Sequence, residues 1–503
     1  MVAKTKTFTF NGIEAIPIDV QVKISSGRSL FSIVGLPDKS VGESKERVRA
    51  AITSTGLSWP FEKITVNLAP ADLQKEGGHF DLAIALGIMI EIGVLPQNLF
   101  DNFFIMGELS LDGSINKVSG IISSAITANQ LNNGLICPFD NGREAVWVGD
   151  LEVIAVPNIL SLINHLKGIQ IIERPPNFAN FKNINYPDFI DVKGQETAKR
   201  ALEISASGGH NMLMIGPLGT GKSMLASRLP SILPDLNLME ILEINMISSM
   251  SDKLIDGQLI TSRQFREVHH SCSMPAMVGG GVKAKPGEVS FAHNGVLFLD
   301  ELAEFPRQVL DALRQPLENG MIHISRTNSQ ATYPADFQLI CAMNPCKCGY
   351  LGDATKECKR APLCGEEYKN KISGPLLDRI DIVVEVANFD FFSNDFPKAE
   401  SSAEIKSRVE NARNIQEQRF KEYPEFVECK KINAKIAGKY LDKFCKIDEK
   451  SQNFLQHFIN KNRISIRGVN RILRVARTIA DMDFTEDISY KHLAEAVSYR
   501  RKI

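Results

Sequence analysis

The chain has 503 residues, of which 58 are basic and 59 acidic, giving a formal net charge of −1. This length exceeds what a single hydrophobic core usually organises and predicts two to four domains. The balanced charge excludes an overall electrostatic attraction to nucleic acid or to an anionic membrane, so any such binding must use a local patch.

Membrane insertion and secretion are not expected either. The longest apolar stretches, such as 82–90, are shorter than the roughly 20 residues of a membrane span, and the first residues contain no hydrophobic signal segment. Nine cysteines in a chain of this length do not indicate a disulfide framework. We therefore expect a cytoplasmic protein with reduced thiols and no membrane association.

The first third of the sequence alternates strand-like and helix-like segments. Apolar runs predict strands at 64–69, 103–109 and 151–157, and helical periodicity predicts helices at 39–54 and 81–92. We assign residues 1–172 to one α/β domain. Residues 173–187 are rich in Pro and Asn and lack periodicity, so they are predicted to be a linker.

The rest of the chain divides into a second α/β part and a helical part. Residues 188–390 begin with a predicted helix at 195–207, an apolar strand at 212–215, a Gly-rich loop and another helix. Residues 391–503 are charged and helical, and their clearest predicted helices are 403–420 and 465–481. We therefore predict a central domain that binds phosphate and a C-terminal all-helical domain.

The Gly-rich loop reads GPLGTGKS and fits the nucleotide-binding pattern G-x-x-x-x-G-K-[ST]. It consists of Gly216, Pro217, Leu218, Gly219, Thr220, Gly221, Lys222 and Ser223. In such a P-loop the backbone N–H groups surround phosphate oxygens, the lysine reaches the β- and γ-phosphates, and the hydroxyl binds Mg²⁺. We predict that this loop binds ATP and its Mg²⁺. The alternative is an ordinary Gly-rich turn.

Two carboxylates follow a second apolar strand, 296–299, in the stretch GVLFLDEL. In a P-loop enzyme Asp300 would hold the Mg²⁺ and its water shell, and Glu301 would orient and polarise the attacking water. By itself the pattern is more typical of a strand that ends in a solvated acidic turn. The P-loop upstream makes the catalytic interpretation the favoured one.

Two further polar residues stand among apolar ones. Asn344 ends the predicted strand 337–345, where a side-chain amide could reach the γ-phosphate or the attacking water, although an Asn turn before a proline is the alternative. Arg379 lies in SGPLLDRIDIVVEV, and phosphate is a suitable partner for an arginine in apolar surroundings. An intrachain salt bridge from Arg379 to Asp378 or Asp381 is the alternative.

Six stretches, taken in order along nearly the whole chain, resemble one known family. They are VGLPDKSVGESKERVRAAI (34–52), NLAPADLQKEGGHFDLAIALG (67–87), GPLGTGKS, PGEVSFAHNGVLFLDEL (286–302), AMNPCKCGY (342–350) and SGPLLDRID (373–381). The chain thus resembles the YifB/ComM family of magnesium-chelatase-like AAA+ ATPases. The resemblance implies an N-terminal domain similar to the Lon protease domain (ribosomal-protein-S5-domain-2-like), a central AAA+ P-loop NTPase domain and a C-terminal helical lid.

The resemblance also implies roles for individual residues. Asn344 looks like the first sensor residue, and Arg379 looks like an arginine finger that acts on the ATP of a neighbouring subunit. A finger in trans implies a homo-oligomeric ring, and a hexamer is expected. Arg467, Arg471 and Arg474 fall on one face of the predicted helix 467–481. One of the first two is similar to the second sensor, whereas a solvated basic face is the alternative.

Two insertions resemble elements that line the central pore of related motors. They lie at about 240–290 and in the hairpin-like segment 322–337. Lys283, Lys285 and Arg326 are the candidates for contacts with DNA phosphates, although they could be ordinary surface charges.

The comparison with Lon argues against proteolysis. His79 falls where Lon has its nucleophilic serine, and Ile122 lies near the position of the lysine base. Acyl transfer needs a nucleophile and a base, so we expect no protease activity and a structural or ligand-contacting role for His79.

Four cysteines cluster after the first sensor, at Cys346, Cys348, Cys358 and Cys364. Four thiolates can bind a structural Zn²⁺, but the spacing C-x-C-x9-C-x5-C is not a standard pair of C-x2-C knuckles. Reduced free thiols are the favoured interpretation, and zinc is the alternative.

The expected function is that of an ATP-hydrolysing ring motor acting on single-stranded or branched DNA. The resemblance implies branch migration or helicase activity that supports the integration of transforming DNA. The alternative is a magnesium-chelatase-like ATPase that remodels proteins without DNA activity, which the Lon-like domain disfavours. A nucleotide-binding scaffold without turnover is disfavoured because Glu301, Asn344 and Arg379 are all present.

Overall fold

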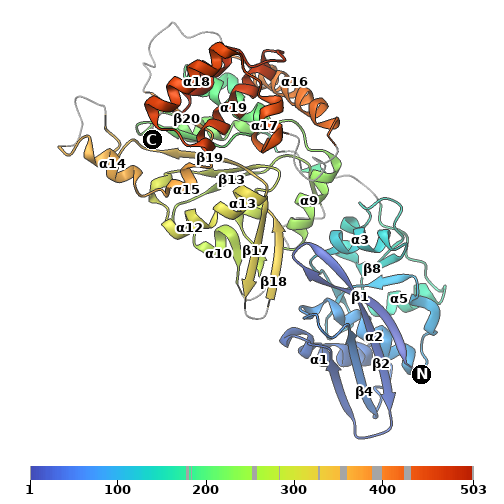
Figure 1. Cartoon of the computed structure of the whole chain (residues 1–503). Helices are drawn as coiled ribbons and strands as arrows, with labels where there is room; N and C mark the ends of the chain where they lie inside the picture. The colour runs from blue at the N-terminus through green and yellow to red at the C-terminus, as the bar shows by residue number, and fades with distance from the viewer. Residues whose placement is uncertain are drawn as a thin grey trace.

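The computed structural model describes residues 2–176, 181–182, 184–251, 258–281, 284–326, 329–351, 359–387, 399–423 and 432–500. Figure 1 shows an N-terminal domain in blue beside a central domain in green and yellow, which the C-terminal helices cover in orange and red. The predicted α/β fold class with three parts is confirmed. Among the described helices, none is both long and apolar enough to cross a membrane.

A seven-stranded mixed sheet forms the centre of the N-terminal domain. In spatial order its strands are β3 (Leu30–Val34), β4 (Lys63–Ala69), β2 (Glu14–Ser25), β1 (Ala3–Asn11), β5 (Phe103–Ile105), β8 (Gly134–Pro138) and β9 (Val153–Val156). β2 pairs antiparallel with β1 and β4, and the other neighbours are parallel. The strands predicted at 64–69 and 151–157 are β4 and β9.

Helices cover both faces of this sheet. They are α1 (Lys39–Ser54), α2 (Asp81–Glu91) and α5 (Ile159–Leu166) on one face and α3 (Ile121–Gln130) and α4 (Gly142–Ala145) on the other. The two cores receive alternate residues of β8 and β9, as the two-residue period of a strand requires. α2 is buried along nearly its whole length, which explains its apolar sequence. The helices predicted at 39–54 and 81–92 are confirmed.

The single strand predicted at 103–109 is wrong. The chain leaves the sheet after β5 and forms β6 (Glu108–Leu109), which pairs with β7 (Ile115–Asn116). Gly107 lies at the break, where a Cβ would approach a side-chain carbon of Ile115 to 2.8 Å and one of Leu82 to 3.1 Å. The chain therefore passes too close to α2 for a side chain, and this packing overrides the apolar pattern.

The central domain is built on five parallel strands. In spatial order they are β13 (Phe265–Val268), β16 (Val296–Leu299), β19 (Gln338–Met343), β11 (Met212–Ile215) and β20 (Ile382–Glu385). β16, β19 and β11 are covered on both faces, and their nearly continuous apolar sequences reflect this burial. The strands predicted at 212–215 and 296–299 are confirmed, and the one at 337–345 is shortened to β19.

Short helices pack on both faces of the central sheet. α6 (Glu196–Gly208), α7 (Lys222–Ala226) and α8 (Leu229–Ile232) lie on one face, and α11 (Glu288–Phe291), α12 (Arg307–Ala312), α13 (Arg314–Asn319), α14 (Leu363–Lys369) and α15 (Gly374–Leu377) lie on the other side. α6 is the helix predicted at 195–207.

Two insertions extend from this domain. The first contains α9 (Leu238–Ser249), β12 (Leu259–Ile260), α10 (Met274–Val278), β14 (Gly279–Gly280) and β15 (Lys285–Pro286). The second is the hairpin of β17 (Met321–Arg326) and β18 (Ser329–Pro334), which confirms the hairpin predicted within 322–337. The predicted linker differs in one respect, because its residues Phe181–Lys182 form β10 and pair with β12.

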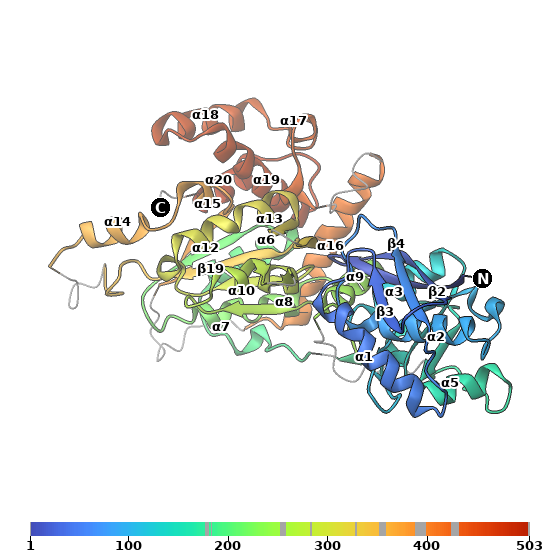
Figure 2. The same cartoon turned by 90° about the horizontal axis from the view of Figure 1, so that it is seen from below.

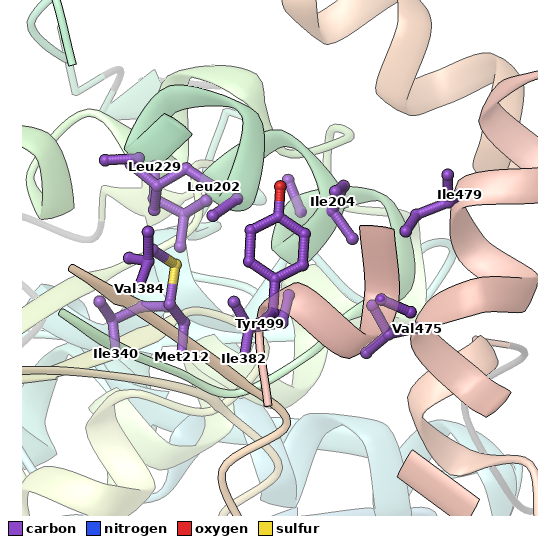
Figure 3. Close-up of a cluster of buried hydrophobic side chains, with 14 of the residues drawn as sticks. Leu202, Ile204, Met212, Leu229, Ile340, Ile382, Val384, Val475, Ile479 and Tyr499 are labelled. Carbon is purple, nitrogen blue, oxygen red and sulfur yellow. The ribbon is translucent and has the colours of Figure 1, made fainter. Parts of the chain in front are cut away.

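The C-terminal helices share a core with the central domain. They are α16 (Ser402–Lys421), α17 (Lys439–Phe444), α18 (Glu449–Asn462), α19 (Ile466–Met482) and α20 (Tyr490–Ser498), and α16 and α19 confirm the helices predicted at 403–420 and 465–481. Figure 3 shows Val475 and Ile479 of α19 in one apolar cluster with Leu202 and Ile204 of α6 and with residues of the sheet. The lid is therefore fixed to the face of the sheet by apolar packing.

The N-terminal domain contacts both insertions. The β1–β2 turn lies against β18, where a Cβ on Gly12 would be 1.9 Å from the carbonyl oxygen of Thr332. At the other contact α3 and α9 lie side by side, and the Gly120 amide donates to the Ser249 carbonyl at 3.2 Å (Figure 2). The apolar residues of this second contact include Ile122, Ile126, Ile241, Met246 and Leu259. The N-terminal domain thus packs against both insertions of the central domain.

Gly12→Ala is expected to loosen the contact with the hairpin. Gly12 has φ +64° and backbone atoms of Thr332 in the path of a Cβ, whereas Gly149 has φ +65° and open space there. Both alanine variants carry the left-handed strain of about 1–2 kcal/mol, but only Gly12→Ala adds a clash. Hydrogen exchange of the β18 amides should be faster in Gly12→Ala than in Gly149→Ala. Equal exchange in the two variants would show that the turn does not hold the hairpin.

Candidate nucleotide-binding site

Three adjacent parallel strands bring the predicted nucleotide residues together. The P-loop follows β11, Asp300 and Glu301 follow β16, and Asn344 follows β19, so all of them leave the sheet at its carboxyl edge. They enclose a cavity of ≈ 340 Å³. Its lining is Leu218, Gly219, Thr220, Gly221, Lys222, Ser223, Met224, Asp300, Glu301 and Asn344.

The glycines of the loop are required by its geometry. A Cβ on Gly216 would lie 2.2 Å from the carbonyl oxygen of Val386, because the loop passes directly over the chain that follows β20. Gly221 has φ +83° and begins α7, a conformation that residues with a side chain rarely adopt. Both positions explain why the fixed residues of the pattern are glycines.

Lys222 is held inside the loop. Its Nζ donates to the carbonyl oxygens of Gly216 at 2.8 Å and Pro217 at 2.7 Å and to Oδ1 of Asn344 at 3.2 Å. Burial lowers the pKa of Lys222, while the charges of Asp300 and Glu301 act in the opposite direction. The ammonium group and the Asn344 amide thus already meet at the point where a terminal phosphate would bind.

Ser223 and Asp300 form a pair of oxygen ligands. The Ser223 Oγ donates to Oδ2 of Asp300 at 2.7 Å, and the other Asp300 oxygen accepts from the Glu301 amide at 2.9 Å. A hydroxyl and a carboxylate at this spacing suit Mg²⁺, which binds few protein oxygens and keeps phosphate and water ligands. The residues present therefore fit a Mg²⁺ that arrives with a nucleotide.

Glu301 has a partner that the sequence analysis missed. Nδ1 of His270 lies 3.2 Å from Oε2 of Glu301. His270 belongs to no motif, but it follows β13 by two residues as Glu301 follows β16, and the two strands pair with Val268 opposite Leu299. A correct prediction of the strand order would therefore have placed the two side chains next to each other.

The structure does not bring the predicted arginines to this chain's own P-loop. Arg379, Arg467, Arg471 and Arg474 line a different cavity of ≈ 890 Å³. Arg379 pairs with Glu318 rather than with either aspartate considered from the sequence. Nε of Arg379 is buried and has no hydrogen-bond partner among the described residues.

The arginines in this second cavity disfavour one another's charge. Burial lowers the pKa of Arg379, and the nearby guanidinium groups of Arg314, Arg471 and Arg467 lower it further. Arg471 is partly compensated, because its Nε lies 3.7 Å from Oδ1 of Asp381. The cavity as a whole is lined by as many acidic as basic side chains, but the guanidinium groups around Arg379 and its unused donor suit an anion at that point.

Comparisons with known proteins agree with this architecture. Residues 188–392 match the family model described as magnesium chelatase, subunit ChlI; residues 20–141 match the model for subunit ChlI of Mg-chelatase, and residues 399–500 match its C-terminal model. The competence protein ComM of Haemophilus influenzae is 41% identical over 500 residues, which cover 98% of this chain and 96% of that protein. The chain belongs to the YifB/ComM family of magnesium-chelatase-like AAA+ proteins.

Other relatives support the same assignment. YifB of Escherichia coli K12 is 44% identical over 492 residues, covering 97% of this chain and 95% of that protein. The chloroplastic magnesium-chelatase subunit ChlI of Nicotiana tabacum is 24% identical over 312 residues, covering 56% of this chain and 68% of that subunit. As a YifB/ComM-family member, the chain is an ATPase that uses ATP and Mg²⁺.

The cysteines of this family member provide no support for zinc. The sulfur atoms of Cys346 and Cys348 lie 3.0 Å apart, and Cys358 lies outside the described residues. Among the residues that the structure describes, no group of three or more His, Cys, Asp or Glu side chains could hold a metal ion, so Cys364 does not complete a site there.

The residues singled out by the Lon comparison are buried. His79 places Nε2 2.8 Å from the Phe8 carbonyl oxygen, and burial lowers its pKa to about 4. Ile122 is fully buried at the contact with the central domain. Of the candidates for DNA contacts, Lys285 is exposed on β15, whereas Lys283 and the side chain of Arg326 lie outside the described residues.

Lys222→Ala is expected to lower ATP turnover by about 100-fold or more, since it removes a charge that stabilises the phosphates during transfer. Phosphate release and the binding of a fluorescent ATP analogue measure the loss. The matched control is Lys39→Ala, because Lys39 is 95% exposed on α1 and far from the cavity in sequence. Turnover near the wild-type value in Lys222→Ala would rule out this cavity as the site of hydrolysis.

Proposed function

We propose that the chain is an ATP-driven ring motor that acts on DNA, with branch-migration or helicase activity that supports the integration of transforming DNA. The proposal of a multi-subunit motor is supported by one observation: the predicted ATPase residues line two different cavities. Glu301 and Asn344 lie with the P-loop, whereas Arg379 and Arg467 lie in the other cavity. If all of these residues act on one ATP, a complete site would need a second copy of the chain.

The chemistry within one cavity is the activation of water. Lys222 and the loop amides would hold the triphosphate, and Ser223 and Asp300 would hold its Mg²⁺, which neutralises charge on the phosphates. Glu301 would accept a proton from the attacking water as the water oxygen bonds to the γ-phosphorus and the bond to the β–γ bridging oxygen breaks. Asn344, bonded to Lys222, would position the γ-phosphate or that water.

The arginine cavity would receive the nucleotide of a neighbouring subunit. Arg379 would act as the finger and Arg467 or Arg471 as the second sensor, both in trans. Anionic phosphates would relieve the mutual repulsion that lowers the pKa of Arg379. Because each copy would give one cavity and accept the other, the contact would be heterologous, and such contacts form a ring when the rotation between subunits closes. We propose a closed ring of six subunits.

Two considerations favour DNA as the substrate. One is that a relative named competence protein is 41% identical to the chain over nearly its full length. The other is geometric: the β17–β18 hairpin projects from the central domain in Figure 1, and exposed Lys285 lies on the neighbouring insertion. Lysines on such extensions suit the phosphate backbone of DNA.

The domain limits that we propose remain 1–172, 188–390 and 391–503, with a linker at 173–187.

A mixing experiment tests the composite site. Arg379→Ala alone is expected to bind ATP normally and to lose about 10³-fold in turnover, and Glu301→Gln alone should bind ATP without turnover. When the two variants are mixed, some interfaces combine an intact Arg379 with an intact Glu301, so phosphate release should partly recover. A mixture as inactive as its components would contradict the contribution in trans.

The substrate is tested by ATP turnover with and without a synthetic four-way DNA junction. We expect the junction to stimulate ATP turnover and to be converted to products. Both effects should be absent in Glu301→Gln, because branch migration requires ATP hydrolysis. If no DNA changes the rate of ATP turnover, the ATPase assignment would still hold. The alternative would then be favoured, a magnesium-chelatase-like ATPase that remodels a protein partner.

A further inference from the structure

The side chain of Arg379, the proposed arginine finger, is turned into its own subunit. It is 11% exposed, its Nη2 donates to the carboxylate of Glu318, and its Nη1 donates to the carbonyl oxygen of Pro375. Both acceptors belong to the same chain as Arg379. Nitrogen atoms engaged in this way cannot at the same time bind the phosphate of a neighbouring subunit's ATP.

We propose that Glu318 is a positioning residue that acts as a latch: it holds Arg379 in this withdrawn position and yields it to the phosphate of the neighbouring subunit's ATP. This inference rests on the proposed function, in which Arg379 acts in trans. A carboxylate and a phosphate compete for one guanidinium group, because both accept paired N–H bonds from it. The phosphate must therefore displace Glu318 before the finger can act, and this exchange slows ATP turnover.

The main chain at Arg379 confines the exchange to its side chain. The Arg379 amide donates to the Leu376 carbonyl at 2.8 Å, and the Arg379 carbonyl accepts from Nδ2 of Asn211 at 2.9 Å. Asn211 directly precedes β11, so this contact ties the backbone of Arg379 to the central sheet. The guanidinium group therefore leaves Glu318 by rotation of the side chain on a fixed backbone.

The position of Glu318 is also fixed. Glu318 lies in the last turn of α13, which ends at Gly320 with φ +67°. The Gly320 amide donates to the Pro316 carbonyl at 2.8 Å, and the Gly320 carbonyl accepts from the Ala335 amide at 2.8 Å. The helix end is thus held by its own turn and by the chain that follows β18. The carboxylate stays in place when the guanidinium group leaves and can bind it again.

The surroundings of Arg379 favour its transfer to a phosphate. Glu318 is 56% exposed, so water weakens its attraction for the guanidinium group. Burial and the positive charges of Arg314, Arg471 and Arg467 lower the pKa of Arg379. Its buried Nε has no hydrogen-bond partner among the residues that the structure describes. A terminal phosphate carries more negative charge than one carboxylate and has three oxygen atoms, so it can replace Glu318 and also accept from Nε.

A mixture of two full-length variants tests the latch in trans. Arg379→Ala keeps Glu301 but has no finger, whereas Glu301→Gln supplies the finger to its neighbour. Glu318→Gln is then added to the Glu301→Gln component, where it removes the charge that holds the finger. The kcat of the mixture should rise about two- to fivefold, the size expected of a half-exposed ion pair. The KM for ATP should not change, since the finger acts on the transferring phosphate and not on the loop that binds ATP.

Glu400→Gln in the same component is the matched control. Glu400 is 53% exposed, pairs with Arg408 at 2.7 Å and belongs to the lining of neither cavity. The mixture that contains it should have the same kcat as the mixture of Arg379→Ala with Glu301→Gln.

The outcomes separate the latch from the proposed function. An equal or lower kcat with Glu318→Gln, an equal rise with Glu400→Gln, or a fall in KM without a rise in kcat would overturn the latch and leave the action of Arg379 in trans intact. If no mixture recovers ATP turnover, the action in trans is refuted, and the latch is refuted with it.

Discussion

The arrangement of the site depends on the burial of three parallel strands side by side. β16, β19 and β11 are covered on both faces, so their register is fixed by apolar packing as well as by backbone hydrogen bonds. A slip of one residue would turn every core side chain to the other face. It would also remove Asp300 from Ser223 and Asn344 from Lys222, which are now in hydrogen-bond contact. The polar site is thus positioned by an apolar core.

The proposed assembly would join the P-loop cavity of one copy to the arginine-containing cavity of the next. The P-loop cavity holds one lysine with two carboxylates. The other cavity carries acidic and basic side chains in equal number, but around Arg379 it brings several guanidinium groups together. Glu318 compensates Arg379 only in part, since Nε of that arginine has no partner among the described residues. A phosphate from another subunit, as proposed, would satisfy both the charge around Arg379 and its unused donor. Nucleotide binding and subunit contact would therefore stabilise each other.

The local parts of the site could be predicted from the sequence, and the long-range parts could not. The P-loop and the strand before Asp300 each have a recognisable sequence pattern, so both could be predicted locally. Their position near each other could be predicted because each follows a strand of the same parallel sheet. His270 and Glu318 were missed because their roles depend on pairing across 31 and 61 positions of sequence. The break in 103–109 was missed for a similar reason, since it results from contact with α2 at Gly107.

The N-terminal domain is connected to the central domain through a chain of close contacts. Its β1–β2 turn abuts β18, and β17 of the same hairpin packs on Gly279, nine residues after His270 in the chain. Because the N-terminal domain packs closely on the hairpin at Gly12, it limits how far the hairpin can move. The hairpin in turn limits the segment that begins at His270. The N-terminal domain thus contacts the insertions of the central domain without contributing a residue to the lining of the nucleotide cavity.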